Sequence, residues 1–157
     1  MKGNDRVIEV LNELLTFELT AINQYFLHSR MCDDWGYNRL AARLREISRE
    51  EMDDAEEIID RILFLEGVPN MQRLEPVRIG ETVSEQLRLQ AESEQRALSI
   101  LGQGVAAADE AGDRASREFF AARLQEEEGH LDWLETQLGL IDQIGEANYL
   151  TQQIVAH

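Results

Sequence analysis

Acidic side chains and one histidine interrupt the apolar stripes of this sequence at positions that a helical bundle would bury. They are Glu18, Glu51, Asp54, Glu94, Glu127 and His130. A buried carboxylate without a partner is costly, and no Lys or Arg falls in the stripes at these levels. A pair of divalent cations bridged by carboxylates, with His130 adding an imidazole nitrogen, would neutralise the charge. The sequence therefore predicts a di-metal centre.

The spacing of these residues separates the metal hypothesis from a simpler one. A single Glu in a helix stripe usually lies at the edge of an interface, with its stem buried and its carboxylate in water. Here four consecutive helices contribute, two with single acids and two with residues three apart on one helix face. Ferritin-like di-iron bundles use one Glu from each of two helices and Glu-x-x-His from each of the other two. Asp54 stands where the second His of that pattern is expected.

Apolar residues at three- and four-residue spacing predict the helices that must position these side chains. The expected helices span residues 5–34, 38–66, 82–111 and 113–141, with a short tail helix at 146–155. The long connection between the second and third helices holds both prolines. Connections in the order short, long, short predict an all-α, ferritin-like four-helix bundle with one long crossover and a short fifth helix. We assign residues 1–157 to one such domain.

The composition excludes several classes of function. The 157 residues carry 31 acidic against 15 basic side chains, and the net charge of -16 would repel nucleic acid and anionic lipid. One cysteine, Cys32, allows neither an intramolecular disulfide nor a cysteine-rich metal site. No stretch approaches the roughly 18 consecutive apolar residues of a membrane span. We expect an unprocessed cytoplasmic protein that binds neither nucleic acid nor membrane.

The sequence resembles the bacterioferritin family from its first residues to its tail helix. The similarity is carried by residues 21–28 (AINQYFLH), 61–67 (RILFLEG), 69–70 (PN) and 127–135 (EEGHLDWLE). The resemblance implies a hollow shell of 24 subunits that oxidises Fe(II) with O2 or peroxide and stores a ferric mineral core. It also implies a b-type haem between subunit pairs and a reductase or ferredoxin that supplies electrons for iron release.

The resemblance also assigns roles to the acids in the stripes. It implies that Glu18, Glu51, Glu94, Glu127 and His130 form the ferroxidase centre, with Glu51 and Glu127 as bridges. The family has His at the sixth position, where this sequence has Asp54. Asp is shorter and donates oxygen instead of nitrogen, so one iron site is expected to bind or turn over differently.

A second set of residues is assigned to haem only by the resemblance. Met52 follows Glu51 and so points about 100° away from the metal stripe. From spacing alone it is an apolar filler of an interface. The resemblance instead implies that Met52 is the axial ligand of haem iron. It implies a haem pocket lined by Leu19, Ile22, Asn23 and Phe26.

Three alternatives stay open at this level. The chain could be a haem-binding shell subunit whose metal site is impaired by Asp54 and which works in a mixed shell with a second subunit. It could be another di-metal bundle, such as a rubrerythrin-like peroxidase or a manganese catalase, although the four-cysteine module of the first is missing. Glu46 and Glu50 could handle iron on the inner wall or form a solvated acidic face.

Overall fold

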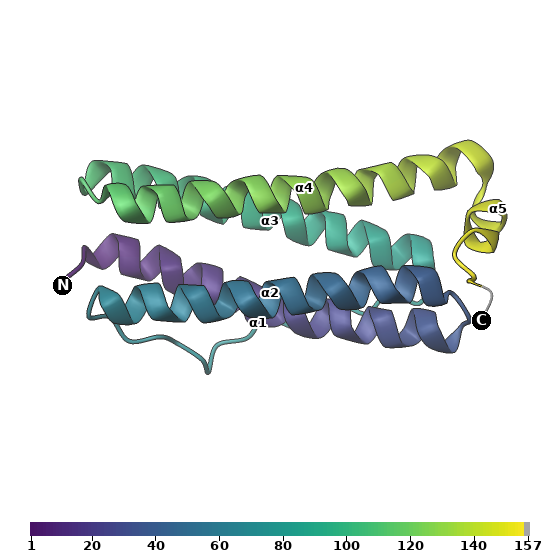
Figure 1. Ribbon diagram of the computed structural model, residues 1–157, viewed down its shortest axis with the longest axis horizontal. Coiled ribbons are helices and arrows are strands. Elements are labelled where there is room, and N and C mark those ends of the chain that lie inside the picture. Colours follow the sequence, from purple (N-terminus) through teal and green to yellow (C-terminus); the bar gives the residue numbers. More distant parts are fainter. Residues whose placement is uncertain (156–157) are drawn as a thin grey trace.

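Five helices, joined by turns and one long crossover, make up the computed structural model, which describes residues 1–155 (Figure 1). They are α1 (Asp5–Asp34), α2 (Asn38–Phe64), α3 (Val83–Glu110), α4 (Arg114–Ile144) and α5 (Glu146–Thr151). No strand occurs within the described range. The all-α bundle with a short fifth helix is as expected from the periodicity. The tail helix is shorter than expected, and α4 runs three residues further, to Ile144.

The end of α2 is formed by Glu66 and not by the neighbouring Gly67. The left-handed residue that terminates the helix is Glu66, with φ 61°. The Glu66 and Gly67 amides donate to the carbonyls of Leu63 and Ile62, the paired bonds of a Schellman motif. Gly67 is needed for a different reason, because a Cβ there would lie 2.8 Å from the Ile8 side chain.

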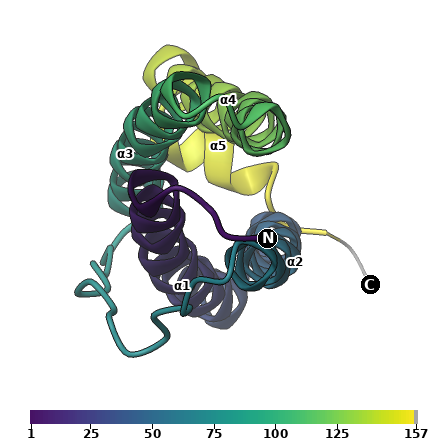
Figure 2. The same cartoon turned by 90° about the vertical axis from the view of Figure 1, so that its left-hand side faces the viewer.

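The four long helices pack in two antiparallel pairs. α1 lies along α2 and α3 along α4, and α1 also lies beside α3. The crossover lies on the outside of α1, as the end-on view in Figure 2 shows, and it contacts α1 from Asn12 to His28. At the end where α1 leads into α2, α5 covers the bundle, and its Tyr149 is buried. The Arg39 amide donates to the Gln153 carbonyl at 2.9 Å, so the tail is attached to its own bundle.

Two apolar clusters fill the bundle, one toward each end. One contains Tyr25, Leu44 and Leu134, and the other contains Leu11, Ile58 and Phe120. The acids predicted as ligands lie in each helix close to where the residues of one cluster give way to those of the other. The core is therefore polar in the middle of the bundle and apolar on either side.

A row of polar side chains on α1, the α1 polar row, faces the crossover. Its members follow one another at intervals of four residues, and they are Asn12, Thr16, Thr20, Gln24 and His28. This spacing places them on one helix face, beside the apolar stripe. Apart from Asn12, which is partly exposed, these side chains are buried.

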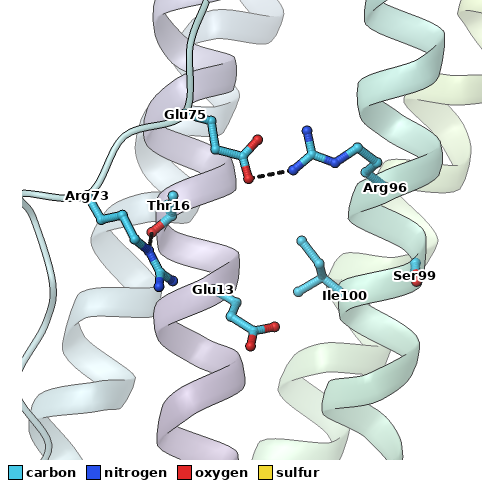
Figure 3. Close-up of a pocket in the computed structure, with 7 residues that line it drawn as sticks. All are labelled: Glu13, Thr16, Arg73, Glu75, Arg96, Ser99 and Ile100. Atoms are coloured by element: carbon cyan, nitrogen blue, oxygen red, sulfur yellow. Dashed lines mark hydrogen bonds and ion pairs between the residues drawn. The ribbon is translucent and has the colours of Figure 1, made fainter.

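Each member of the α1 polar row accepts a hydrogen bond from the crossover. Backbone amides of the crossover reach four members at 2.8–3.0 Å, in the pairs Asn70 to Asn12, Glu75 to Thr20, Arg78 to Gln24 and Gly80 to His28. The Arg73 guanidinium donates to the Thr16 hydroxyl at 3.2 Å (Figure 3). The crossover has no secondary structure, so these bonds provide the partners that its backbone needs.

No described helix combines the length and the apolar character needed to cross a membrane.

Candidate metal centre

All six predicted ligand residues are buried at the middle of the bundle. The most exposed of them, Asp54, shows 8% of its surface, and Glu51, Glu94 and Glu127 show none. Burial of so many acids is unusual, because carboxylates are almost never fully buried unless they are paired. The helices that carry these residues are regular, so the free-energy cost of this arrangement comes from burying the charged side chains.

The six side chains form two overlapping groups. In each group, one donor atom per residue lies within 4.8 Å of all the others. The histidine half-site consists of Glu51, Glu94, Glu127 and His130. The aspartate half-site consists of Glu18, Glu51, Asp54 and Glu127. Glu51 and Glu127 belong to both, which is the arrangement that two bridged cations require.

Most of the carboxylate oxygens at this centre have no hydrogen-bond partner. Such atoms are both oxygens of Glu18 and Glu51 and one oxygen each of Glu94 and Glu127. Glu51 Oε1 lies 3.1 Å from His130 Nδ1 as an ion pair, without hydrogen-bond geometry. Buried polar atoms in native proteins are normally satisfied. Hard cations prefer oxygen ligands, so the donor set fits a pair of divalent cations.

Burial raises the affinity of three carboxyl groups of the centre for protons, and the neighbouring carboxylates raise that of His130. Burial raises the pKa of Glu51 to about 8 and that of Asp54 to about 7. Burial also raises the pKa of Glu94 well above its usual range. Burial opposes the charge on His130, but the carboxylates of Glu127 and Glu51 outweigh it and raise the pKa of the imidazole to about 11. The centre therefore attracts positive charge, which a metal ion would supply more effectively than protons do.

Two contacts from neighbouring side chains hold the ligands in place. The Tyr25 hydroxyl donates to Glu94 Oε1 at 2.7 Å. His130 Nε2 lies 2.9 Å from Glu50, and this leaves Nδ1 facing the carboxylates. Glu50 is also paired with Arg43, 3.3 Å away. Glu50 is thus half-buried and bound to the centre, so it is not part of a freely solvated acidic face.

One cation near the centre contradicts the expectation that none lies at this level. Arg123 is 6% exposed and forms an ion pair with Glu57 across the α2–α4 contact. Its charge acts on Asp54, where it opposes the effect of burial on the pKa. Arg123 stands four residues before Glu127, which is the spacing of a shared helix face. This spacing indicates that Arg123 faces the centre, but the apolar stripe of the sequence runs through Phe120 and Leu124 and leaves Arg123 out.

Comparison with known proteins agrees with this geometry. A family model described as a ferritin-like domain matches residues 8–144. A bacterioferritin of Brucella melitensis is 48% identical over 95% of this chain and 92% of its own length. A bacterioferritin of Mycobacterium tuberculosis is 48% identical over 97% and 96%, and one of Streptomyces coelicolor is 47% identical over 98% and 92%. The chain belongs to the bacterioferritin family.

The bacterioferritin resemblance also assigned haem residues, and these lie on the outside of the α1–α2 pair. Met52 is 55% and Phe26 50% exposed, and Asn23 is exposed, while Leu19 and Ile22 are partly buried. The Ser48 hydroxyl donates to the Ile22 carbonyl, which fixes the register of the two helices. Because α1 and α2 are antiparallel, one turn onward from Ser48 brings Met52 to the level of Leu19.

A separate pocket of this bacterioferritin chain lies against the crossover. Figure 3 shows its lining, which comes from α1, the crossover and α3 and consists of Glu13, Thr16, Arg73, Glu75, Arg96, Ser99 and Ile100. Arg96 is paired with Glu75, and Arg73 with Thr16. None of the six metal-centre residues lines this pocket. The cavity belongs to the packing of the crossover and is separate from the metal chemistry.

Proposed function

We propose that this bacterioferritin-family chain is an iron-storage subunit that oxidises Fe(II) at the two half-sites and passes Fe(III) to a mineral core. The observation that supports this most strongly is the set of six buried carboxylate oxygens without a hydrogen-bond partner, arranged with one imidazole as two half-sites that share two residues. Fe(II) is the substrate. Two Fe(II) supply the two electrons that reduce O2 to hydrogen peroxide, or hydrogen peroxide to water.

Each residue of the centre has a separate role in binding the cations. Glu51 and Glu127 would hold both cations, and Glu94 and Glu18 would complete one half-site each. His130 offers Nδ1 to the histidine half-site, because its Nε2 faces Glu50 at 2.9 Å. The imidazole must lose its Nδ1 proton when a cation binds, since a metal ligand has to be deprotonated. Glu50 and Tyr25 hold His130 and Glu94 in orientation, as outer-shell partners of metal ligands do.

Asp54 is a working ligand in this proposal. Its carboxylate lies with Glu18, Glu51 and Glu127 within the 4.8 Å group of the aspartate half-site. The second candidate function is a haem-bearing shell subunit with an impaired ferroxidase centre. The observation that favours it is Arg123, whose positive charge acts on Asp54 and competes with a cation there.

We further propose that haem binds between two copies of this chain. The exposed thioether of Met52 and the half-exposed ring of Phe26 offer a soft axial ligand and an apolar surface on the same outer side of the α1–α2 pair. Leu19, Ile22 and Asn23 would complete the pocket. Haem, when bound, would carry electrons for iron release, supplied by a reductase or ferredoxin.

The assembly that goes with this function is a shell of 24 subunits, built of this chain alone or of this chain and a second bacterioferritin subunit. The acidic excess of the chain suits a cavity that gathers Fe(II). The cytoplasmic location stays a prediction. A sizing column separates the shell from the smaller di-metal bundles considered above.

The experiment that tests the proposal adds Fe(II) aerobically to the metal-free protein and follows the ferric absorbance. The wild type should oxidise iron rapidly, and Glu94→Ala should abolish the fast phase. Glu92→Ala changes an exposed acid on the same helix and serves as the matched control. Equal rates in wild type and Glu94→Ala would contradict the proposed site. Slow oxidation by the wild type, restored by Asp54→His, would establish the second candidate.

A further inference from the structure

A further cavity lies at the end of the bundle that α5 covers, and its lining is basic. It has a volume of about 470 Å³ and is bounded by α2, α4 and the tail. The lining of this α5 cavity consists of Arg39, Leu40, Arg43, Trp133, Gln137, Leu140, Gln152 and Gln153. Within residues 1–155, its charged groups are thus two arginines, in a chain with a net charge of -16. This composition favours an anionic ligand.

The crossover pocket (Figure 3) differs from the α5 cavity in its charges. Glu13 and Glu75 line that pocket together with Arg73 and Arg96. Glu75 already neutralises Arg96 through an ion pair. The α5 cavity contains no acid among the described residues that line it. Its guanidinium groups are therefore better placed to bind an anion from solution.

Hydrogen bonds between separate elements fix the walls of the α5 cavity. The Arg39 amide donates to the Gln153 carbonyl at 2.9 Å, which joins the start of α2 to the tail. The Tyr149 hydroxyl donates to Gln137 Oε1 at 2.8 Å, which joins α5 to α4. Leu40, which also lines the cavity, is buried. The cavity is therefore formed before a ligand binds, as most small-molecule sites are.

Arg43 is held in place but keeps two of its nitrogen atoms available. Its guanidinium lies over the Trp133 ring, 5.6 Å from the centroid. Nη1 pairs with Glu46 at 3.1 Å and with Glu50 at 3.3 Å. Nε and Nη2 have no hydrogen-bond or ion-pair partner in residues 1–155. A guanidinium that stacks on an aromatic ring still donates in its own plane, so these atoms can bind an oxyanion.

Arg39 and two glutamines add donors that the fold does not use. The Arg39 side chain is exposed and forms no ion pair or hydrogen bond with residues 1–155. Gln137 accepts from Tyr149 through Oε1, so its Nε2 remains a donor. The side-chain amide of Gln153 has no partner in the described part of the chain either. Hydrogen bonds from guanidinium groups to oxyanions are among the strong ones, and two guanidinium groups can balance a doubly charged anion.

The acids that share Arg43 compete with such a ligand. Glu46 and Glu50 lie on α2, three and seven residues after Arg43, and their side chains are 62% and 42% exposed. Ion pairs of exposed acids contribute little to stability, so an incoming dianion can displace Glu46 from the guanidinium. Removal of the Glu46 charge should therefore strengthen the binding of an anion.

We propose that the α5 cavity binds the phosphate group of a small molecule, held by the guanidinium groups of Arg39 and Arg43 and by the Gln137 amide. A phosphate group carries close to two negative charges at neutral pH, about one for each guanidinium. Leu140 and Trp133 offer apolar surface to an organic group attached to the phosphate. None of the six residues of the metal centre lines the cavity, so this site does not depend on the proposed iron oxidation.

The test is a titration of the metal-free protein with inorganic phosphate at constant ionic strength, followed by tryptophan fluorescence. The chain has two tryptophans, so Trp35→Phe leaves Trp133 in the cavity as the source of the signal. Metal is removed first, because a bound hard cation would itself bind phosphate oxygens. The fluorescence should change along a saturating curve, and calorimetry should give one phosphate per chain.

Two variants in this background should shift the affinity in opposite directions. Arg39→Gln removes one guanidinium and should weaken phosphate binding on the order of 10-fold, the size of one hydrogen bond to a charged group. Glu46→Gln frees Arg43 and should tighten binding several-fold. Arg88→Gln is the matched control, because Arg88 is exposed on α3 outside the cavity and its loss changes the net charge as Arg39→Gln does. Arg39 and Glu46 are exposed, so both variants should fold.

Phenyl phosphate distinguishes the two sources of a phosphate group. Tighter binding of phenyl phosphate than of inorganic phosphate would identify a phosphate ester as the ligand, and equal or weaker binding would identify free phosphate. Opposite shifts in Arg39→Gln and Glu46→Gln support the inference. A fluorescence signal that saturates with neither probe overturns it, and so does equal phosphate binding by Arg39→Gln and Arg88→Gln. An unchanged affinity in Glu46→Gln would overturn the role of Arg43.

Discussion

The α1 polar row and the metal centre are both buried and polar, but their atoms are satisfied in opposite ways. Every member of the row has a partner in the crossover at 2.8–3.2 Å. The carboxylates of the centre leave six oxygens without one. A satisfied hydrogen bond contributes about 1 kcal/mol to stability, whereas a buried polar group without a partner lowers stability. The comparison indicates that the row holds the crossover on the bundle, and it supports the proposal that the centre binds cations.

The largest difference should appear when a divalent cation is added. A cation at 100 times its Kd stabilises the native state by about 2.7 kcal/mol, so two sites give about 5 kcal/mol. We expect this rise when Co(II) is added to the metal-free protein, measured by denaturant unfolding with and without chelator. His28→Gln should show the same rise as the wild type. The same rise in Glu127→Gln would remove the distinction between the two regions.

Acid should weaken the row through His28. Its Nε2 accepts from the Gly80 amide at 3.0 Å, so this nitrogen carries no proton. Burial lowers the pKa of His28 to about 4 from its ordinary value of 6.5. The unfolded chain therefore binds the proton first, and stability falls as the pH drops from about 6.5 to 4, by about 3 kcal/mol.

His28→Gln provides the control for this pH dependence. A glutamine can accept from the Gly80 amide without titrating in this range. Unfolding of the metal-free variant should depend less on pH between 6.5 and 4 than unfolding of the metal-free wild type. Parallel curves for the two proteins would show that His28 is not the group responsible.

A single change in the middle of the row should have a smaller effect that does not depend on metal. Thr20→Val keeps the shape but removes the hydroxyl that accepts from the Glu75 amide. The loss should be about 1–2 kcal/mol, the cost of an unpaired amide. Thermal unfolding should show the same loss with and without Co(II). A loss that disappears when Co(II) binds would place Thr20 in the metal centre.

The smallest effect should come from the hydrogen bond that Tyr25 donates to the centre. Tyr25→Phe removes the donor to Glu94 Oε1 and adds another unpartnered oxygen. The metal-free protein should lose about 1 kcal/mol. Bound Co(II) would satisfy Glu94, so the loss should shrink in the loaded protein. An equal loss in the metal-free and the Co(II)-loaded protein would show that Tyr25, like the α1 polar row, stabilises the fold independently of metal.

The helices and the acids of the centre could be predicted from the sequence because both depend on spacing along one helix. The role of the α1 polar row could not be predicted, because it depends on hydrogen-bond partners more than fifty residues away in the sequence. Its four-residue spacing from Asn12 to His28 was visible, but the crossover amides that it binds have no sequence signal. Arg123 was missed for a related reason. Its spacing from Glu127 was visible, but its partner Glu57 is on another helix.

The positions of Glu66 and Gly67 show a further limit. A glycine at a helix end predicts a left-handed residue, yet here the close approach of Ile8 requires the glycine and Glu66 takes the left-handed position. Two constraints compete for one glycine. Local sequence rules treat only one of them, because the other arises from tertiary packing.

Hydrogen bonds to the α1 polar row fix the conformation of the crossover, although it contains no helix or strand. Its amides at Asn70, Glu75, Arg78 and Gly80 bind side chains in the way that the amides of a strand bind a neighbouring strand. We therefore expect these four amides to exchange slowly with deuterium, in a stretch that has no helix or strand. The intervals between them are also fixed. One residue inserted between Glu75 and Gly80 would shift the later amides away from their partners, so this long connection should tolerate insertions poorly.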